Sequence, residues 1–257
     1  MKKIIFLLIA ISTIFSSVGA FAAPTITELM ANIDLRMEQI GDMSAKIAMV
    51  QKKASQSSPK HFEFLWFRKD ITDEFLMITT APDSDKGNGY LRVGENFWMY
   101  RQNTRTFQHI SRDESILGTD AKSGDFERKK LTQLYKPLLD ASGKEALTEE
   151  MLGKKPVYKF TIVAKVSDVT YPKQIYWVQK DNFLILKAQS FSRDGTLMQS
   201  GYYTKYTEKD GRFIPIYQIF VDEFEKGNKT IVEISGISFR TLDSRIFTKA
   251  YLENLSK

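Results

Sequence analysis

The sequence predicts a mostly β protein, built from antiparallel strands with a few helices, and three observations lead to this fold class. From Ala45 onward, segments rich in aromatic and β-branched residues alternate at the two-residue period of a strand. Turn-forming pairs of residues separate these segments at short intervals. One amphipathic helix precedes them, and its apolar stripe needs a sheet to pack on.

The first 22 residues match a cleavable signal peptide. Lys2 and Lys3 precede a short apolar run, and small residues lead to Ala20-Phe21-Ala22. The run is shorter than the ~20 residues that a membrane-spanning helix needs. We therefore expect residues 1–22 to be removed on export from the cytoplasm. Residues 23–257 show no linker and are expected to form a single domain.

A helix is predicted at the start of the mature chain. Thr25 and Glu28 have the spacing of a capping box, and apolar residues then recur at helical intervals. The apolar stripe consists of Ile26, Leu29, Ile33, Met37 and Ile40. Gly41 follows as a stop signal. The stripe predicts that this helix lies on the sheet.

The strands that follow carry apolar side chains on both faces. Phe62, Phe64 and Trp66 share one face of a strand, with Leu65 and Phe67 on the other. Residues 97–100 repeat this two-faced pattern. A short turn at Gly87-Asn88-Gly89 leads into the strand 90–93.

Turns divide the carboxyl-terminal half into an antiparallel meander. One turn signal, Gly94-Glu95-Asn96, lies in the first half of the chain, and four lie in the second half: Asp181-Asn182, Asp194-Gly195, Asp210-Gly211 and Gly227-Asn228. The last four cut residues 173–240 into five strands. Residues 111–140 break this rhythm, with a helix predicted over 126–135 and ended by Pro137. A short closing helix is predicted over 244–255.

An open antiparallel sheet with one face in water would alternate cleanly between apolar and polar residues, and several of these strands do not. The second face must be covered by helices, by another sheet or by an apolar ligand in a groove. A filled core and a ligand cavity satisfy the pattern equally. Six methionines fit either case, because thioethers fill irregular gaps and also line adaptable binding surfaces. They are Met30, Met37, Met43, Met49, Met77 and Met99.

The candidate lining of such a cavity is aromatic. It consists of Phe62, Phe64, Trp66, Trp98 and Tyr100, in two sets that each share one strand face. The alternative is that these five residues belong to an ordinary packed core.

Catalytic and metal chemistry find little support in the sequence. The chain has two histidines and no cysteine, and His61 and His109 have no convergent ligands nearby in sequence. Asp222, Glu223 and Glu225 could imitate the paired carboxylates of a hydrolase, but they read more simply as charges at a strand end. We therefore predict no enzyme, no metal and no cofactor.

The charge distribution argues against nucleic acid as a partner. The formal net charge of +6 includes Lys2 and Lys3. The remaining basic residues are dispersed along the chain, whereas a nucleic-acid interface would cluster them.

One stretch of the sequence resembles a known family. Its residues are Gly89-Tyr90-Leu91-Arg92-Val93-Gly94, Phe97-Trp98-Met99-Tyr100, Arg105, Ile110 and Leu117-Gly118-Thr119-Asp120. This stretch is similar to the LolA-like outer-membrane lipoprotein-sorting family, and the order of predicted elements agrees along the whole mature chain. Two departures occur. Gln102-Asn103 stands where the family has a turn with proline, and residues 121–125 are an insertion before Phe126.

The resemblance implies a strongly curved antiparallel half-barrel, of the type of LolA, LolB and RseB, with helices covering its concave face. It further implies a periplasmic carrier of the acyl chains of lipids or lipoproteins. Its partners would be an inner-membrane transporter and an outer-membrane acceptor. The alternative within the same architecture is an RseB-like regulator or lipid sensor of envelope stress, which would act through contacts with other proteins.

Overall fold

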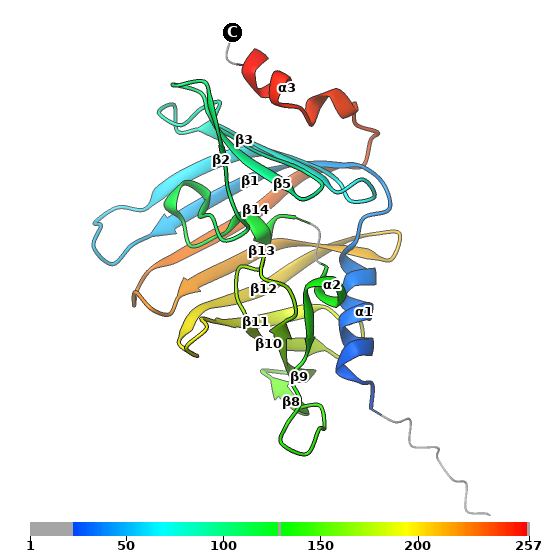
Figure 1. Cartoon of the computed structure of the whole chain (residues 1–257). Coiled ribbons are helices and arrows are strands. Elements are labelled where there is room, and N and C mark those ends of the chain that lie inside the picture. Colours follow the sequence, from blue (N-terminus) through cyan, green and yellow to red (C-terminus); the bar gives the residue numbers. More distant parts are fainter. Residues whose placement is uncertain (1–22, 128–129, 256–257) are drawn as a thin grey trace, which may run out of the picture.

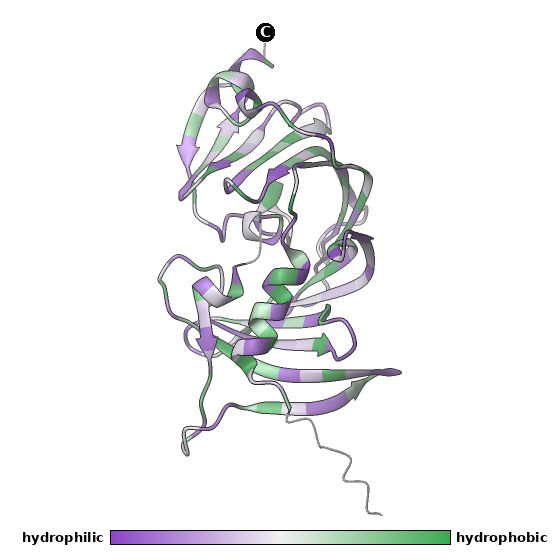
Figure 2. Cartoon of the chain, turned by 90° about the vertical axis from the view of Figure 1, so that its right-hand side faces the viewer, coloured by the Kyte–Doolittle hydropathy of each residue, from purple (hydrophilic) through white to green (hydrophobic). Residues whose placement is uncertain are grey.

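The structure is a computed structural model that describes residues 23–127 and 130–255, so the predicted signal peptide lies outside the described residues. Within these ranges fourteen strands form one open sheet, and every pair of neighbouring strands is antiparallel. The predicted fold class is confirmed. The sheet bends around the side on which helix α1 lies (Figures 1 and 2).

The first half of the sheet is a meander of six strands that starts at its centre and ends at one edge. These strands are β1 (Met43–Lys52), β2 (Lys60–Lys69), β3 (Glu74–Ala81), β4 (Gly89–Val93), β5 (Asn96–Arg101) and β6 (Thr106–His109). The predicted turn after β4 is confirmed, because Val93 pairs with Asn96 across it.

The second half starts at the opposite edge and returns to the centre, where β14 pairs with β1. Its strands are β7 (Tyr135–Pro137), β8 (Leu147–Leu152), β9 (Lys155–Ala164), β10 (Lys173–Gln179), β11 (Ile185–Phe191), β12 (Leu197–Lys209), β13 (Arg212–Asp222) and β14 (Lys229–Ser238). The five-stranded meander predicted for residues 173–240 corresponds to β10–β14. Its tightest turn has Asp210 and Gly211 both at positive φ, 51° and 72°, as a type I′ hairpin requires.

Helix α1 (Ile26–Met37) begins at the predicted capping box: Thr25 accepts from the Glu28 N–H, and the Glu28 carboxylate accepts from the Thr25 N–H. Four residues of the predicted stripe are buried. The prediction for Ile40 was wrong, because the helix ends at Met37 and Ile40 is 61 % exposed. The chain turns away there, since the Gln39 N–H donates to the Asp70 carboxylate at the end of β2.

A long connection leads from β6 across the sheet toward the opposite edge. We call its part from residue 111 to residue 127 the crossing segment. It contains two 3₁₀ turns, Ile116–Gly118 and Ser123–Asp125. The helix predicted over 126–135 is wrong in extent, because α2 spans only Leu131–Leu134 and the chain then enters β7. Phe126 is buried instead against the sheet.

Two apolar clusters occupy the concave face side by side. Under α1, the helix stripe packs on side chains of β9–β12 that include Phe160, Tyr176 and Tyr203. Under the crossing segment, apolar residues of β1–β5, β13 and β14 form the second cluster. All six methionines named above are buried in these two clusters.

The opposite, convex face of β3–β5 is covered by the end of the chain. The predicted closing helix is present in two parts, a 3₁₀ turn at Ser244–Ile246 and α3 (Lys249–Asn254), at the top of Figure 1. Phe247 and Leu252 pack there on Leu76 and Leu91. Gly89 allows this close packing, because a Cβ atom there would lie 2.5 Å from a methyl carbon of Leu252 and would force that side chain to shift.

Candidate functional site: the covered concave face

Three of the five predicted lining residues lie together on the concave face. Phe62, Phe64 and Trp66 of β2 project into the cluster beneath the crossing segment and are at most 5 % exposed. They are flanked by Met49 of β1, which pairs with Phe62, and by Met77 of β3, which pairs with Trp66. The structure therefore places an aromatic surface where the sequence predicts one.

The structure does not bring Trp98 and Tyr100 to this surface. They belong to the cluster on the convex face, where the Lys249 ammonium lies 4.3 Å from the Trp98 ring and the Tyr100 ring lies 4.7 Å from that of Phe107. Phe97 and Met99 of the same strand face the concave side. The prediction that Trp98 and Tyr100 line the same surface as Phe62, Phe64 and Trp66 is therefore corrected. The two-residue period shows which residues share a face, but it does not show which face of β5 continues that of β2.

The crossing segment fills the concave face with its own side chains. The Phe126 ring meets the Trp66 ring edge-on, with centroids 6.2 Å apart. Ile116 and Ala121 are fully buried in the same cluster. Beside Phe126 only a small space of about 20 Å³ remains, too small for an alkyl chain. Any guest on this surface must therefore displace the crossing segment or enter from its side.

Hydrogen bonds attach the middle of the crossing segment to the sheet. The Leu117 N–H donates to the Tyr90 hydroxyl over 3.1 Å, and the Gln51 side chain donates to the Gly118 carbonyl over 2.6 Å. Asp120 accepts from the Thr230 hydroxyl over 2.8 Å. Burial raises the pKa of the Asp120 carboxyl, and this hydrogen bond only partly opposes the shift. These attachments are polar and can be exchanged for water.

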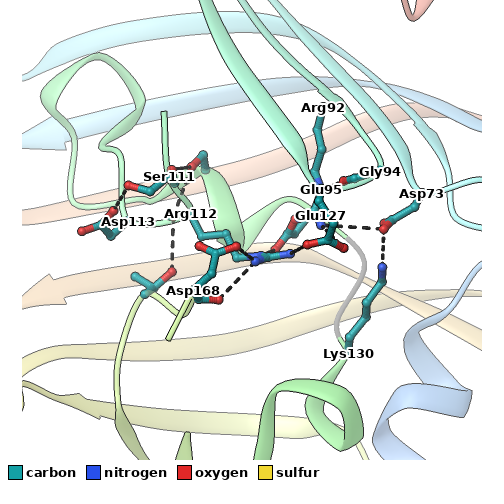
Figure 3. A network of polar contacts seen from close by, with 12 residues as sticks. Asp73, Arg92, Gly94, Glu95, Ser111, Arg112, Asp113, Glu127, Lys130 and Asp168 are labelled. Carbon is teal, nitrogen blue, oxygen red and sulfur yellow. Dashed lines mark hydrogen bonds and ion pairs between the residues drawn. The ribbon is translucent and has the colours of Figure 1, made fainter. Parts of the chain in front are cut away.

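Ion pairs hold the end of the crossing segment (Figure 3). The Glu127 carboxylate lies between two guanidinium groups, with its Oε1 atom 2.7 Å from Arg112 Nε and its Oε2 atom paired with Arg92. Arg112 also pairs with Asp168, which precedes β10. The side chains of Arg92, Arg112 and Glu127 are all less than 10 % exposed. Burial and the neighbouring Arg112 lower the pKa of Arg92.

A second ion pair extends this network toward α2. Lys130 pairs with Asp73 in the turn between β2 and β3, and Asp73 also lies 3.7 Å from Arg92 (Figure 3). Sequence analysis did not identify this network. A signal was present, since Arg92 follows Tyr90 on the face that is apolar in the neighbouring strands, and a charge at such a position needs a buried partner.

Open space remains at the sides of the crossing segment. One cleft has a volume of about 550 Å³ and lies between residues 114–118 and the ends of β2–β5, with Phe62, Tyr90 and Met99 in its lining. A second cleft, of about 370 Å³, lies next to Arg92 and Arg112. The first cleft is large enough for part of an alkyl chain.

The two histidines considered for catalysis are placed apart from each other. His61 lies in the lining of the larger cleft, whereas the His109 ring packs edge-on against Trp98 on the other face. Asp222 accepts from the N–H groups of Phe224 and Glu225 and so closes the turn before β14. In residues 23–127 and 130–255 no group of His, Asp and Glu side chains has the arrangement of a metal site. In the same ranges no helix has the length and apolarity to cross a bilayer.

An open, curved antiparallel sheet whose concave face is covered by a helix and a crossing segment defines a class of half-barrel. A family model described as that of an uncharacterized protein matches residues 72–254, the larger part of the chain. The chain belongs to this family. Its fold is that of the LolA-like outer-membrane lipoprotein-sorting proteins, which confirms the resemblance seen in the sequence.

Similar solved structures support this assignment of the fold. A LolA superfamily protein of Nitrosomonas europaea is 22 % identical, with a TM-score of 0.75 over 89 % of this chain and 100 % of its own. A domain described as outer membrane lipoprotein-sorting, from Vibrio parahaemolyticus, is 20 % identical, with a TM-score of 0.74 over 88 % and 97 %. A DUF1329 family protein of Desulfovibrio piger is 19 % identical, with a TM-score of 0.75 over 88 % and 97 %. No curated protein matched the chain.

Proposed function

We propose that this protein is an exported, periplasmic carrier, which binds the acyl chains of lipids or lipoproteins on its concave face and passes them toward the outer membrane. One observation carries the proposal: the apolar surface of Phe62, Phe64 and Trp66 is covered by a crossing segment that is attached through polar contacts. Such a cover can leave without unfolding the sheet beneath it.

The energetics favour reversible binding. Each methylene group transferred from water to an apolar surface gains ~0.8 kcal/mol. An acyl chain with a dozen buried methylenes gains on the order of 10 kcal/mol, from which the costs of association and of displacing Phe126 are subtracted. The remainder suits a carrier, which must also release its cargo.

The solved structures with this fold support the same proposal. One of them is described as an outer membrane lipoprotein-sorting domain, and the predicted signal peptide agrees with a place of action outside the cytoplasm. An inner-membrane donor and an outer-membrane acceptor would be the partners of such a carrier.

The first experiment asks whether an alkyl chain takes the place of Phe126. Phe126→Ala removes the ring over Trp66 and leaves space that a ligand can fill, so a fluorescent fatty acid should bind more tightly to this variant than to the wild type. Phe247→Ala is the matched control, because Phe247 is equally buried on the convex face. That control should leave the affinity unchanged.

Two further measurements complete the test. Binding of the fatty acid should increase amide hydrogen exchange in the crossing segment and leave exchange in α1 unchanged. Native mass spectrometry of the protein purified from its envelope should show bound lipid or acylated peptide. The proposal fails if neither the wild type nor a folded Phe126→Ala variant binds any alkyl ligand. A stoichiometric protein partner without lipid would instead favour the regulator.

A further inference from the structure

The larger cleft beside the crossing segment combines an apolar floor with a charged rim. Its volume is about 550 Å³. Phe62 of β2, Tyr90 of β4 and Met99 of β5 lie in its floor, and Leu117 of the crossing segment lies opposite. The floor is continuous with the concave aromatic surface, because Phe62 belongs to both. An alkyl chain bound in the cleft therefore reaches the concave apolar surface once it displaces the side chains of the crossing segment.

Three basic side chains lie in the lining where the cleft opens to solvent. Lys60 and His61 come from the first residues of β2, and Arg101 is the last residue of β5. All three are exposed. Among the residues that the structure describes, none of the three forms an ion pair with a carboxylate. Their donors are therefore available to a ligand.

The other polar groups of the lining include two acids and a neutral hydroxyl. The Asp85 carboxylate accepts from the Ser84 hydroxyl over 2.9 Å and from the Asn88 amide over 3.4 Å. Burial raises the pKa of Tyr90 to about 12, so its hydroxyl stays neutral while it accepts from Leu117. Glu114 is the remaining acidic residue of the lining. Lys60 and Arg101 match the two acids in charge but form no ion pair with them, so the donors of Lys60, His61 and Arg101 remain free to bind an anion.

The smaller cleft differs from the larger one in the state of its basic side chains. Arg92 and Arg112 lie in its lining, but both guanidinium groups are already bound to carboxylates of Glu127 and Asp168. That cleft offers no comparable site for an anionic group. The larger cleft, unlike the smaller one, places unpaired cations beside the apolar concave face.

We infer that the larger cleft binds the anionic head group of a single-chain amphiphile, a carboxylate or a phosphate, through Lys60, His61 and Arg101. The alkyl tail runs over Phe62 and Met99, and its end takes the place of the crossing segment on the concave face. This inference rests on the proposed function and specifies its cargo: an anionic lipid with a free head group.

The test compares ligands that share one alkyl chain and differ in head group. Palmitate, hexadecyl phosphate and the neutral methyl palmitate compete with a fluorescent alkyl probe for the full mature chain. The wild type should bind the two anions about tenfold more tightly than the ester, the usual effect of a charge-assisted hydrogen bond. A preference for palmitate indicates a free fatty acid as the source of the head group, and a preference for hexadecyl phosphate indicates a single-chain lipid with a phosphate head group.

The variant Lys60→Gln/Arg101→Gln should lose the preference for anions and keep its affinity for methyl palmitate. The control Lys46→Gln/Lys205→Gln changes the charge equally on the convex face, where Lys205 lies over the Tyr217 ring, and should behave as the wild type. Equal affinities of the wild type for the anions and the ester would overturn the inference while leaving the carrier intact. The inference would also be overturned if the variant Lys60→Gln/Arg101→Gln kept the wild-type preference for anions. Binding of none of the three ligands would overturn both.

Discussion

The two covers of the concave face are held in different ways. Helix α1 presents five buried apolar side chains, from Ile26 to Met37, to an apolar cluster of β9–β12. The crossing segment presents fewer apolar side chains, chiefly Ile116, Ala121 and Phe126, and relies on hydrogen bonds and ion pairs.

This difference indicates which cover can move. Apolar contacts are lost at full cost when they are exposed to water, whereas polar contacts are largely replaced by contacts with water. Helix α1 should therefore remain in place as long as the protein is folded. The crossing segment should open at a lower free energy and act as the movable cover.

The largest expected effect lies under α1. Ile33 is fully buried between the helix and the sheet, so Ile33→Ala should lower the free energy of unfolding by about 2–5 kcal/mol. Urea denaturation measures this loss. Leu35→Ala is the control on the same helix, since Leu35 is 51 % exposed, and it should stay within about 0.5 kcal/mol of the wild type. Equal losses in the two variants would contradict the role given to α1.

The next effect concerns the ion pairs of the crossing segment. Glu127→Gln removes the charge between Arg92 and Arg112 and should cost about 1.5–3 kcal/mol, the worth of hydrogen bonds to a charged group. Hydrogen exchange should rise in residues 111–127 well before it rises in α1.

The control for this variant is Glu95→Gln. The Glu95 side chain is 80 % exposed and lies at the edge of the same network, 4.0 Å from Arg92, so its removal should have little effect. If Glu127→Gln loosened α1 and the crossing segment equally, the two covers would form one cooperative unit and the comparison would fail.

The sequence predicted the periodic parts of the fold well. The capping box of α1, the strand that carries Phe62 and Phe64, and the turns between β10 and β14 depend on local spacing, which is directly visible. The crossing segment has no periodicity. Its structure depends on contacts distant in sequence, such as Asp120 with Thr230, and these could not be predicted from local spacing.

The candidate site was predicted only in part for a related reason. Phe62 and Trp98 each belong to a recognisable strand, but three strand connections and a register shift between β2 and β3 separate them. A shift of one residue moves a side chain to the other face. The concave aromatic set was therefore predictable for β2 alone.

A smaller effect is expected from the hydrogen bond at Tyr90. Tyr90→Phe removes the acceptor of the Leu117 N–H and keeps the ring in the apolar floor, so it should cost about 0.5–1.5 kcal/mol. The loss should appear as faster exchange of the Leu117 amide. Tyr217→Phe, on the opposite face, should leave that amide unchanged. An unaltered exchange rate in Tyr90→Phe would mean that this bond does not hold the crossing segment.

The smallest expected effect is the change with pH in the stability that Asp120 contributes. Burial is the main cause that raises the pKa of its carboxyl. Because its pKa is higher in the folded chain, the stability that this group contributes is complete below the unfolded pKa and is lost as the pH rises through the folded pKa. Asp120→Asn does not titrate and can still accept from Thr230. Its stability relative to the wild type should therefore increase between pH 3 and pH 7.

Urea denaturation of both proteins at the two pH values measures this change, and the difference between them cancels the titration of all other groups. Thr230→Val serves as the control, because it removes the hydrogen bond that opposes the shift and so should enlarge the same pH dependence. A difference between Asp120→Asn and the wild type that is constant with pH would show that Asp120 is solvated as in the unfolded chain. The middle of the crossing segment would then already be open, and its contrast with α1 would be larger than the described contacts indicate.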